Sequence, residues 1–183
     1  EIPVAHRKEK SSATNTPTVG YFAQTPQIMN GTFEDNVTFG LSFDRARFEE
    51  AVSCACLDAD LAIMPAGSQT EIGEVCTCRL PFCHLRSSNQ GLTCSLCLPQ
   101  NGVNLSGGQK ARVAFALLLY HRDRCSLFLI DDLFSAVDVH VGKKMFERGV
   151  DGLLAGKTRV VAASSQVDLL NEADMMLNVL DGQ

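Results

Sequence analysis

The pattern of apolar and polar residues predicts helices in three segments of the chain. After Asp44, which can cap a helix, apolar residues fall at i, i+3, i+4, i+7 and i+8, the spacing of an amphipathic helix. The residues on that face are Phe48, Ala51, Val52, Ala55 and Cys56. A second helix is predicted from Ser106 to about Tyr120, and a third over 139–154, closed by Gly156.

Short apolar runs alternate with these helices and predict strands. The run Leu-Phe-Leu-Ile at 127–130 has no polar alternation, which is typical of a parallel strand buried on both faces. Runs at 19–23, 158–163 and 175–180 predict three more strands. Strands that alternate with helices favour an α/β fold built on a parallel sheet.

The composition fits one globular domain and excludes some function classes. The 183 residues are 45% hydrophobic, which is enough for a core, and the net charge is −5. Acids and bases are interspersed, so no basic stripe predicts binding to nucleic acid. The longest apolar stretch, 114–120, is too short to cross a bilayer. The first residue is Glu1 rather than Met, which suggests a fragment.

The first candidate site is Leu-Ser-Gly-Gly-Gln at 105–109, at the start of the second predicted helix. Ser106 and Gln109 fit a capping box, in which each side chain bonds the backbone N–H of the other. Gly107 and Gly108 let backbone N–H groups approach a ligand, and the free N–H groups of a helix start attract anions. The segment therefore predicts a phosphate-binding helix start. An ordinary capped helix after a glycine turn is the alternative.

The second candidate site is the acid pair Asp131 and Asp132, which follows the apolar run 127–130. The carboxyl ends of buried parallel strands are where α/β sheets bind ligands. Asp131 can hold Mg²⁺ through water, and Asp132 can orient or deprotonate an attacking water. Two solvated acids at a strand end are the alternative.

Four segments in this order resemble the nucleotide-binding domain of ATP-binding-cassette (ABC) transporters. Residues 102–113 resemble the family signature, and 129–138 resemble the Walker B strand running into the D-loop. Residues 21–26 resemble the Q-loop. Residues 30–40 resemble the following segment, which faces the transmembrane domain. The resemblance implies an incomplete P-loop NTPase-like ABC ATPase domain with a parallel sheet core and a helical signature subdomain.

The sequence of these segments is most similar to the C class of ABC proteins, the multidrug-resistance-associated type. Within that class it is most similar to the first nucleotide-binding domain. Asp132 stands where most ABC ATPases have Glu. Ser-Ala-Val-Asp at 135–138 runs into Val-His-Val-Gly-Lys, and Glu-Ile-Gly-Glu at 71–74 comes before the signature. These features imply an exporter subunit.

The resemblance implies an ATPase that works head to tail with a second ABC nucleotide-binding domain. Each ATP would lie between the Walker A loop of one domain and the signature helix of the other. Asp138 would touch the partner across this interface. The signature residues that would bind the nucleotide are Leu105, Ser106, Gly107, Gly108 and Gln109.

The resemblance also implies the metal and water chemistry. Asp131 and Gln24 would bind Mg²⁺, Gln24 would also hold the attacking water, and Asp132 would orient that water. ATP closes the pair of domains and hydrolysis reopens it, which drives the transmembrane domains of the same transporter. We therefore expect the chain at the cytoplasmic face of a membrane, without a transmembrane segment of its own and without a nucleic-acid partner.

Two departures from the family bear on activity. No G-x-x-x-x-G-K-[ST] phosphate loop occurs in the sequence, and since it should precede Gln24, the chain is expected to start too late in the domain. Ser165 stands at the position of the switch His, and a hydroxyl carries no positive charge to the γ-phosphate. The alternative is therefore a catalytically degenerate regulatory or interaction domain. A DNA-repair or chromosome-structure ATPase shares the signature but carries long heptad repeats that this sequence lacks.

The composition changes abruptly at 75–100, which holds five of the eight cysteines and no Asp, Glu or Lys. Joining Glu74 to Asn101 restores an uninterrupted family sequence. The segment begins with Val, whose codons start with GT, and ends with Gln, which CAG can encode, so a retained intron is the first hypothesis. A zinc-binding cysteine module and a surface loop with free thiols are the alternatives. We expect no folded module here.

The expected domain organisation is simple. Residues 1–15 form a polar lead-in that does not match the family, and 16–183 form a partial ABC ATPase domain. Within it, a helical subdomain spans about 42–120 and is interrupted by the insert at 75–100.

Overall fold

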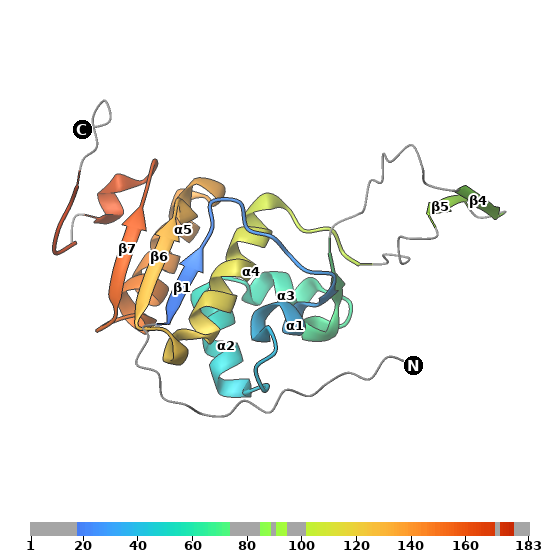
Figure 1. The fold of residues 1–183 in the computed structure, drawn as a ribbon, viewed down its shortest axis with the longest axis horizontal. Coiled ribbons are helices and arrows are strands. Elements are labelled where there is room, and N and C mark those ends of the chain that lie inside the picture. The colour runs from blue at the N-terminus through green and yellow to red at the C-terminus, as the bar shows by residue number, and fades with distance from the viewer. Residues whose placement is uncertain (1–17, 74–84, 89–90, 95–101, 171–172, 178–183) are drawn as a thin grey trace.

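The structure, a computed structural model, describes residues 18–73, 85–88, 91–94, 102–170 and 173–177. A parallel sheet lies on one side of helix α4, and further helices lie on its other side (Figure 1). The elements are, in chain order, β1 (Val19–Phe22), β2 (Gly31–Thr32), α1 (Phe33–Thr38), α2 (Arg45–Cys54), α3 (Asp58–Ile63), the 3₁₀-helix η1 (Gly67–Gln69), β3 (Glu71–Ile72), β4 (Leu85–Ser88), β5 (Gly91–Cys94), α4 (Gly107–Tyr120), the 3₁₀-helix η2 (Arg122–Arg124), β6 (Leu127–Asp131), the 3₁₀-helix η3 (Leu133–Ala136), α5 (Val139–Met145), the π-helix η4 (Phe146–Leu153), β7 (Thr158–Ala162) and the 3₁₀-helix η5 (Val167–Leu170).

The central sheet has the strand order β1-β6-β7, and both pairs of strands are parallel. Phe22 lies beside Ile130, and Asp131 lies beside Ala162. All three strands coincide with apolar runs in the sequence, and helices connect them. The predicted α/β fold with a parallel sheet is therefore confirmed.

One face of the sheet is buried. Phe22, Phe128 and Ile130 are at most 3% exposed and point to the side of helix α4. Gly20 sits so close to this layer that a Cβ would lie 2.9 Å from side-chain atoms of Leu118 and Phe128. A larger residue at this position would push the sheet away from the helix.

The opposite face of the sheet is largely open in the described part of the chain. Val19, Tyr21 and Val160 are 44%, 60% and 55% exposed. Leu127 and Leu129 of β6 point to the same face and are half-buried. An apolar surface therefore follows all three strands, because side chains alternate between the two faces of a strand.

Helix α4 lies at the centre of the hydrophobic core. It packs against β1 on one side and against α1 and α2 on the other (Figure 1). Because its apolar residues point in nearly all directions, the helix is buried on most sides rather than amphipathic. Its buried residues are Ala111, Val113, Phe115, Ala116, Leu118, Leu119 and Tyr120.

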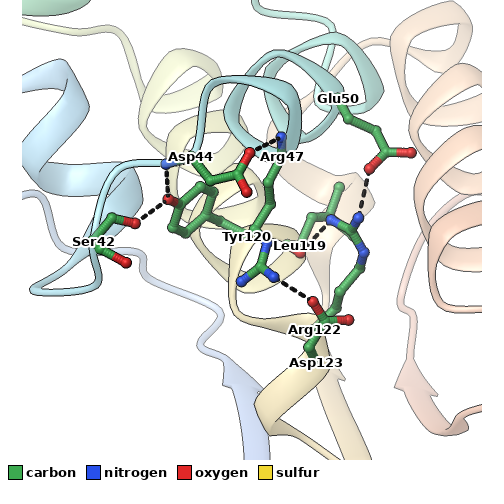
Figure 2. Close-up of polar contacts among 8 residues, drawn as sticks. All are labelled: Ser42, Asp44, Arg47, Glu50, Leu119, Tyr120, Arg122 and Asp123. Carbon is green, nitrogen blue, oxygen red and sulfur yellow. Dashed lines mark hydrogen bonds and ion pairs between the residues drawn. The ribbon is translucent and has the colours of Figure 1, made fainter.

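The last residue of α4 ties this helix to α2, as Figure 2 shows. The Tyr120 hydroxyl accepts a hydrogen bond from the Asp44 N–H at 2.9 Å and donates one to the Ser42 carbonyl at 2.7 Å. The Arg47 guanidinium lies over the Tyr120 ring, 5.6 Å from its centroid, and bonds Asp123 at 2.6 Å. The tyrosine is fully buried, so each polar atom of the contact has a partner.

A second ion pair lies beside this contact. Arg122 of η2 bonds Glu50 of α2 at 2.5 Å, and its guanidinium also donates to the Leu119 carbonyl at 3.3 Å. The start of α2 is therefore joined to the end of α4 through several independent contacts. Strand β6 begins shortly after η2.

The helix predicted over 139–154 is present, but its second half is a π-helix. Helix α5 passes directly into η4. Gly149 lies so close to Phe115 that a Cβ would be 2.6 Å from the ring. Gly156, at φ 74°, then turns the chain toward β7.

The segment 75–100 contains regular structure that the sequence analysis did not predict. Strands β4 and β5 pair antiparallel, with Leu85 beside Cys94. An isolated two-stranded hairpin is marginally stable in water, so this pairing alone does not make a folded module. Of the residues considered as zinc ligands, Cys94 ends β5, and the others, Cys76, Cys78, Cys83, His84 and Cys97, lie outside the described residues.

The strand predicted over 175–180 is wrong for the part that the structure describes. Residues 173–177 form no strand, and Met175 and Leu177 are 78% and 84% exposed. A strand needs a neighbour for its N–H and C=O groups, and in the described part of the chain β7 pairs only with β6. An apolar run alone does not provide that neighbour. Residues 178–180 lie outside the described residues.

Candidate functional site

Polar residues that follow the three strands of the sheet meet at one edge. Because β1, β6 and β7 are parallel, their carboxyl ends lie side by side. Gln24 comes two residues after β1, Asp132 follows β6, and Ser164 comes two residues after β7. The arrangement gathers two carboxylates, an amide and a hydroxyl at this edge.

Asp132 is held at this edge by hydrogen bonds of its backbone and of its side chain. Its backbone has the left-handed conformation, at φ 52° and ψ 38°, and its N–H bonds the Ala162 carbonyl at 2.9 Å. One carboxylate oxygen accepts the Ser164 N–H at 3.0 Å and the Ser164 hydroxyl at 2.7 Å. The second oxygen is 2.9 Å from the same hydroxyl. The side chain is only 9% exposed, so its orientation is fixed.

These contacts lower the pKa of Asp132. The largest cause is the Ser164 N–H, followed by the Ser164 hydroxyl, while burial acts in the opposite direction. The neighbouring Ser135 and Gln24 side chains lower the pKa further. The carboxylate therefore stays ionised at neutral pH and is a weak base. It is better suited to orient a water molecule than to remove its proton.

Asp131 and Gln24 complete the oxygen ligands at this edge. Asp131 ends β6 and is half-buried on the open face of the sheet, whereas Asp132 turns toward Ser164. Gln24 is exposed and follows β1 at the same edge. Carboxylate and amide oxygens are the ligands that Mg²⁺ accepts in proteins. The chemistry of these side chains fits such an ion, and the parallel pairing of β1 with β6 brings Gln24 and the acid pair to one edge of the sheet.

Ser164, which was not selected from the sequence, contacts Asp132, whereas Ser165, the residue expected at the switch position, does not do so through its hydroxyl. The hydroxyl of Ser165 is buried, and among the described residues it has no hydrogen-bond partner. Two adjacent serines look equivalent in a sequence. The hydrogen bonds separate them, since the N–H and the hydroxyl of Ser164 bond the Asp132 carboxylate, whereas the Ser165 hydroxyl does not.

The predicted capping box at the signature segment is present. The Gln109 N–H bonds the Ser106 hydroxyl at 3.2 Å, and the Gln109 side chain accepts the Ser106 N–H at 2.9 Å. Gly107 is exposed, and a Cβ there would meet nothing within 4 Å. Leu105 is buried beneath this turn at 5% exposure. The helix start is thus packed against the core at Leu105 and open at Gly107, as an anion site requires.

Gly108 brings the signature segment against the loop that follows β6. A Cβ at this position would lie 2.9 Å from the Ala136 carbonyl oxygen. Only glycine permits this approach without a shift of one of the two backbones. The two candidate motifs are therefore in contact within one chain.

Helix α3 holds the signature helix in place through an ion pair. The Arg112 guanidinium bonds the Asp60 carboxylate at 2.6 Å, and the two side chains are 16% and 13% exposed. The same guanidinium donates to the Cys56 carbonyl at 2.5 Å, and Gln109 donates to Asp60 at 2.7 Å. Sequence periodicity gave no signal for this contact because its partners are far apart along the chain.

Asp138, the expected contact to a partner domain, is the cap of α5. Its carboxylate accepts the N–H groups of His140 and Val141 at 3.1 and 3.0 Å. The side chain is exposed, so the cap fixes its direction without covering it. Its position thus depends on the path of the chain between Asp132 and Asp138.

The sequence is similar to C-family ABC transporters over most of its length. The chain is 40% identical over 167 residues to "Multidrug resistance protein mrp-7" of Caenorhabditis elegans, a match over 90% of the chain. It is 36% identical to "ATP-binding cassette sub-family C member 3" of Rattus norvegicus over 90% of the chain, and 36% identical to "ABC transporter C family member 3" of Arabidopsis thaliana over 91%. The chain is homologous to a segment of the C-family ABC transporters. No family model matches it.

The chain covers a small part of the length of these relatives. It spans 9% of the length of each of the three proteins named above. Within the residues that the structure describes, no helix has the length and apolar character needed to cross a membrane.

Proposed function

We propose that this C-family segment is the ATP-binding and ATP-hydrolysing region of an ABC exporter, in which hydrolysis drives movement of a substrate across a membrane. The carrying observation is the convergence of Gln24, Asp131, Asp132 and Ser164 at the carboxyl edge of the sheet. In this proposal the segment lies at the cytoplasmic face and acts with a second nucleotide-binding domain and with the transmembrane domains of the same transporter.

The edge residues have separate tasks in the proposed reaction. Asp131 and Gln24 would hold Mg²⁺, which would neutralise charge on the transferred phosphoryl group. Asp132, whose pKa is lowered by Ser164, would orient the attacking water. Since Asp132 is a weak base, positioning rather than proton removal is its main contribution.

The signature helix serves the ATP of the partner domain in this proposal. The exposed N–H groups after Ser106 and the open space at Gly107 support contact with phosphate oxygens. Asp138, exposed on the neighbouring loop, supports a contact across the same interface. Because the 183 residues contain no Walker A sequence, tight binding requires a phosphate loop from outside them.

One observation favours a catalytically degenerate regulatory domain instead. Ser164 already donates its N–H and its hydroxyl to the Asp132 carboxylate, which leaves fewer acceptor sites for a water molecule. A serine there also provides no positive charge for the γ-phosphate. Such a domain would bind nucleotide and close against its partner without hydrolysing it.

Measurement of ATP hydrolysis distinguishes an active ATPase from a regulatory domain. It requires a longer protein that carries a phosphate loop and a partner domain. We expect Asp131→Asn to abolish most of the ATPase activity, because one ligand charge on the metal is lost. Asp168→Asn, on the exposed surface of η5, is the matched control and should leave the activity unchanged. Nucleotide-driven closure without hydrolysis in the unsubstituted protein would favour the regulatory alternative.

A further inference from the structure

Gln166 bridges the loop after β7 to the segment between Asp132 and Asp138. Its side-chain N–H₂ donates to the Phe134 carbonyl at 2.9 Å and to the Val137 carbonyl at 3.3 Å. Both acceptors belong to η3 and the residue that follows it, about thirty positions earlier in the chain. One amide therefore holds two carbonyls of the same turn.

The orientation of this amide is determined by its surroundings. Two carbonyl acceptors require the nitrogen on their side, because an oxygen there would be repelled. The amide oxygen faces Gly142 of α5, and among the described residues this buried atom has no hydrogen-bond partner. A Cβ at position 142 would lie 2.5 Å from that oxygen. The absence of a side chain at Gly142 is thus what makes room for the amide.

The backbone of Gln166 is also specialised. It has the left-handed conformation, at φ 53°, which is unfavourable for a residue with a side chain. Such a conformation persists when surrounding contacts over-determine it. The two hydrogen bonds and the fit against α5 are contacts of this kind.

Ser164 and Gln166 contact different parts of the segment that runs from Asp132 to Asp138. Ser164 holds the Asp132 carboxylate at the start, and Gln166 holds carbonyls in the middle. We propose that Gln166 is a positioning residue, which fixes the turn between Asp132 and Asp138 so that both carboxylates keep their places. This inference rests on the proposed ATPase function but makes a structural claim of its own.

A double-mutant cycle in the 183-residue chain tests the fit between Gln166 and Gly142. Gly142→Ala should lower the Tm of the parent chain by a few degrees, because the new methyl group displaces the amide. In a Gln166→Gly background, which keeps the left-handed backbone without a side chain, the same change should raise the Tm, since Ala is the better helix former. The same sign in both backgrounds would overturn the proposal.

A second measurement tests positioning directly. Gln166→Met keeps the length of the side chain but removes the donor, so the amide resonances of His140 and Val141, which report the Asp138 cap, should shift. The Arg47 amide, bonded to the distant Asp44 cap, is the control and should stay in place. Unmoved His140 and Val141 resonances would contradict the inference.

Turnover in the longer protein separates this inference from the proposed function. There Gln166→Met should lower kcat by roughly tenfold to a hundredfold, the effect of a small misplacement at a reacting centre, with KM for ATP nearly unchanged. Shifted amides with full turnover would show that the turn does not matter for catalysis, which overturns the positioning role. No hydrolysis by the parent protein would refute the ATPase function, and the amide shifts would then decide the structural claim alone.

Discussion

Ser164 donates both its backbone N–H and its hydroxyl to the carboxylate of Asp132. The two residues follow neighbouring parallel strands, so the contact joins the ends of β6 and β7 at the edge where the proposed chemistry occurs. It fixes the charge and the direction of Asp132 at the same time. The same contact occupies oxygens that a water molecule would otherwise use.

Removal of the Ser164 hydroxyl should destabilise the chain at neutral pH and less so in acid. Ser164→Ala should cost roughly 1–3 kcal/mol in the free energy of unfolding at pH 7, the usual value for a bond to a charged group. Since the bond lowers the pKa of Asp132, its stabilisation is complete above the pKa of an unfolded aspartate, about 3.9, and is lost as the pH falls through the lower folded value. Urea unfolding at pH 7 and at pH 2 measures the difference.

Ser126→Ala is the matched control for this change, because Ser126 is exposed. It should leave the free energy of unfolding within about 0.5 kcal/mol of the parent at both pH values. An equal loss for Ser164→Ala at pH 7 and pH 2 would show that the carboxylate charge plays no part.

The anchor of the signature helix should be sensitive to loss of one charge. Asp60→Asn leaves the partly buried Arg112 without its counter-charge. We expect a loss of roughly 2–4 kcal/mol, slightly less than the roughly 3–5 kcal/mol for fully buried pairs, because this pair is partly exposed. Glu49→Gln breaks the exposed pair with Arg45, whose side chains are 68% and 82% exposed, and should cost less than about 0.5 kcal/mol. Denaturant midpoints of the two variants provide the test, and similar losses would contradict it.

A histidine can identify which serine stands at the switch position. Since the family resemblance puts Ser165 at the position of the switch His, it predicts that Ser165→His raises ATP turnover in a protein with a phosphate loop. The geometry favours Ser164→His, because position 164 faces Asp132 while the Ser165 hydroxyl is buried elsewhere. We expect a rise toward the roughly 10²–10³-fold that one transition-state donor contributes. Steady-state hydrolysis by both variants decides, and a larger rise for Ser165→His would reverse the assignment.

Deletion of 75–100 should improve the yield of folded protein. The deletion joins Glu74 to Asn101, and the only described structure that it removes is the β4–β5 hairpin. Transcript sequencing should show this junction in most messages if the segment is an intron. Stoichiometric zinc in the purified chain, or loss of folding on deletion, would instead make the cysteines functional.

The 183-residue chain should bind Mg-ATP weakly or not at all. Its sequence has no G-x-x-x-x-G-K-[ST] loop, and the signature helix alone offers few phosphate donors. Titration calorimetry measures the affinity directly. A dissociation constant in the micromolar range would reveal a phosphate site that the proposed function does not contain.

Local signals in the sequence predicted much of the fold. The Ser106–Gln109 capping box depends on residues three positions apart, and the structure confirms it. Asp44 caps α2 as predicted, since a cap also acts over a few residues. The apolar runs gave the three central strands for the same reason.

Contacts between distant segments were not predictable in this way. The choice between Ser164 and Ser165 depends on how β6 and β7 are aligned, and the sequence carries no local mark of that alignment. The Arg112–Asp60 pair and the Gln166 bridge join positions that are 52 and 29–32 residues apart. The run at 175–180 had the right composition for a strand, but its described residues have no strand beside them.

The open face of the central sheet has a practical consequence for handling the chain. Tyr21 and Val160 present apolar surface to water along strands whose outer edges have no neighbour in the described parts of the chain. Exposed strands of this kind stack with copies of themselves. Colloidal behaviour, rather than the free energy of unfolding, will therefore set the concentration at which the purified chain can be studied.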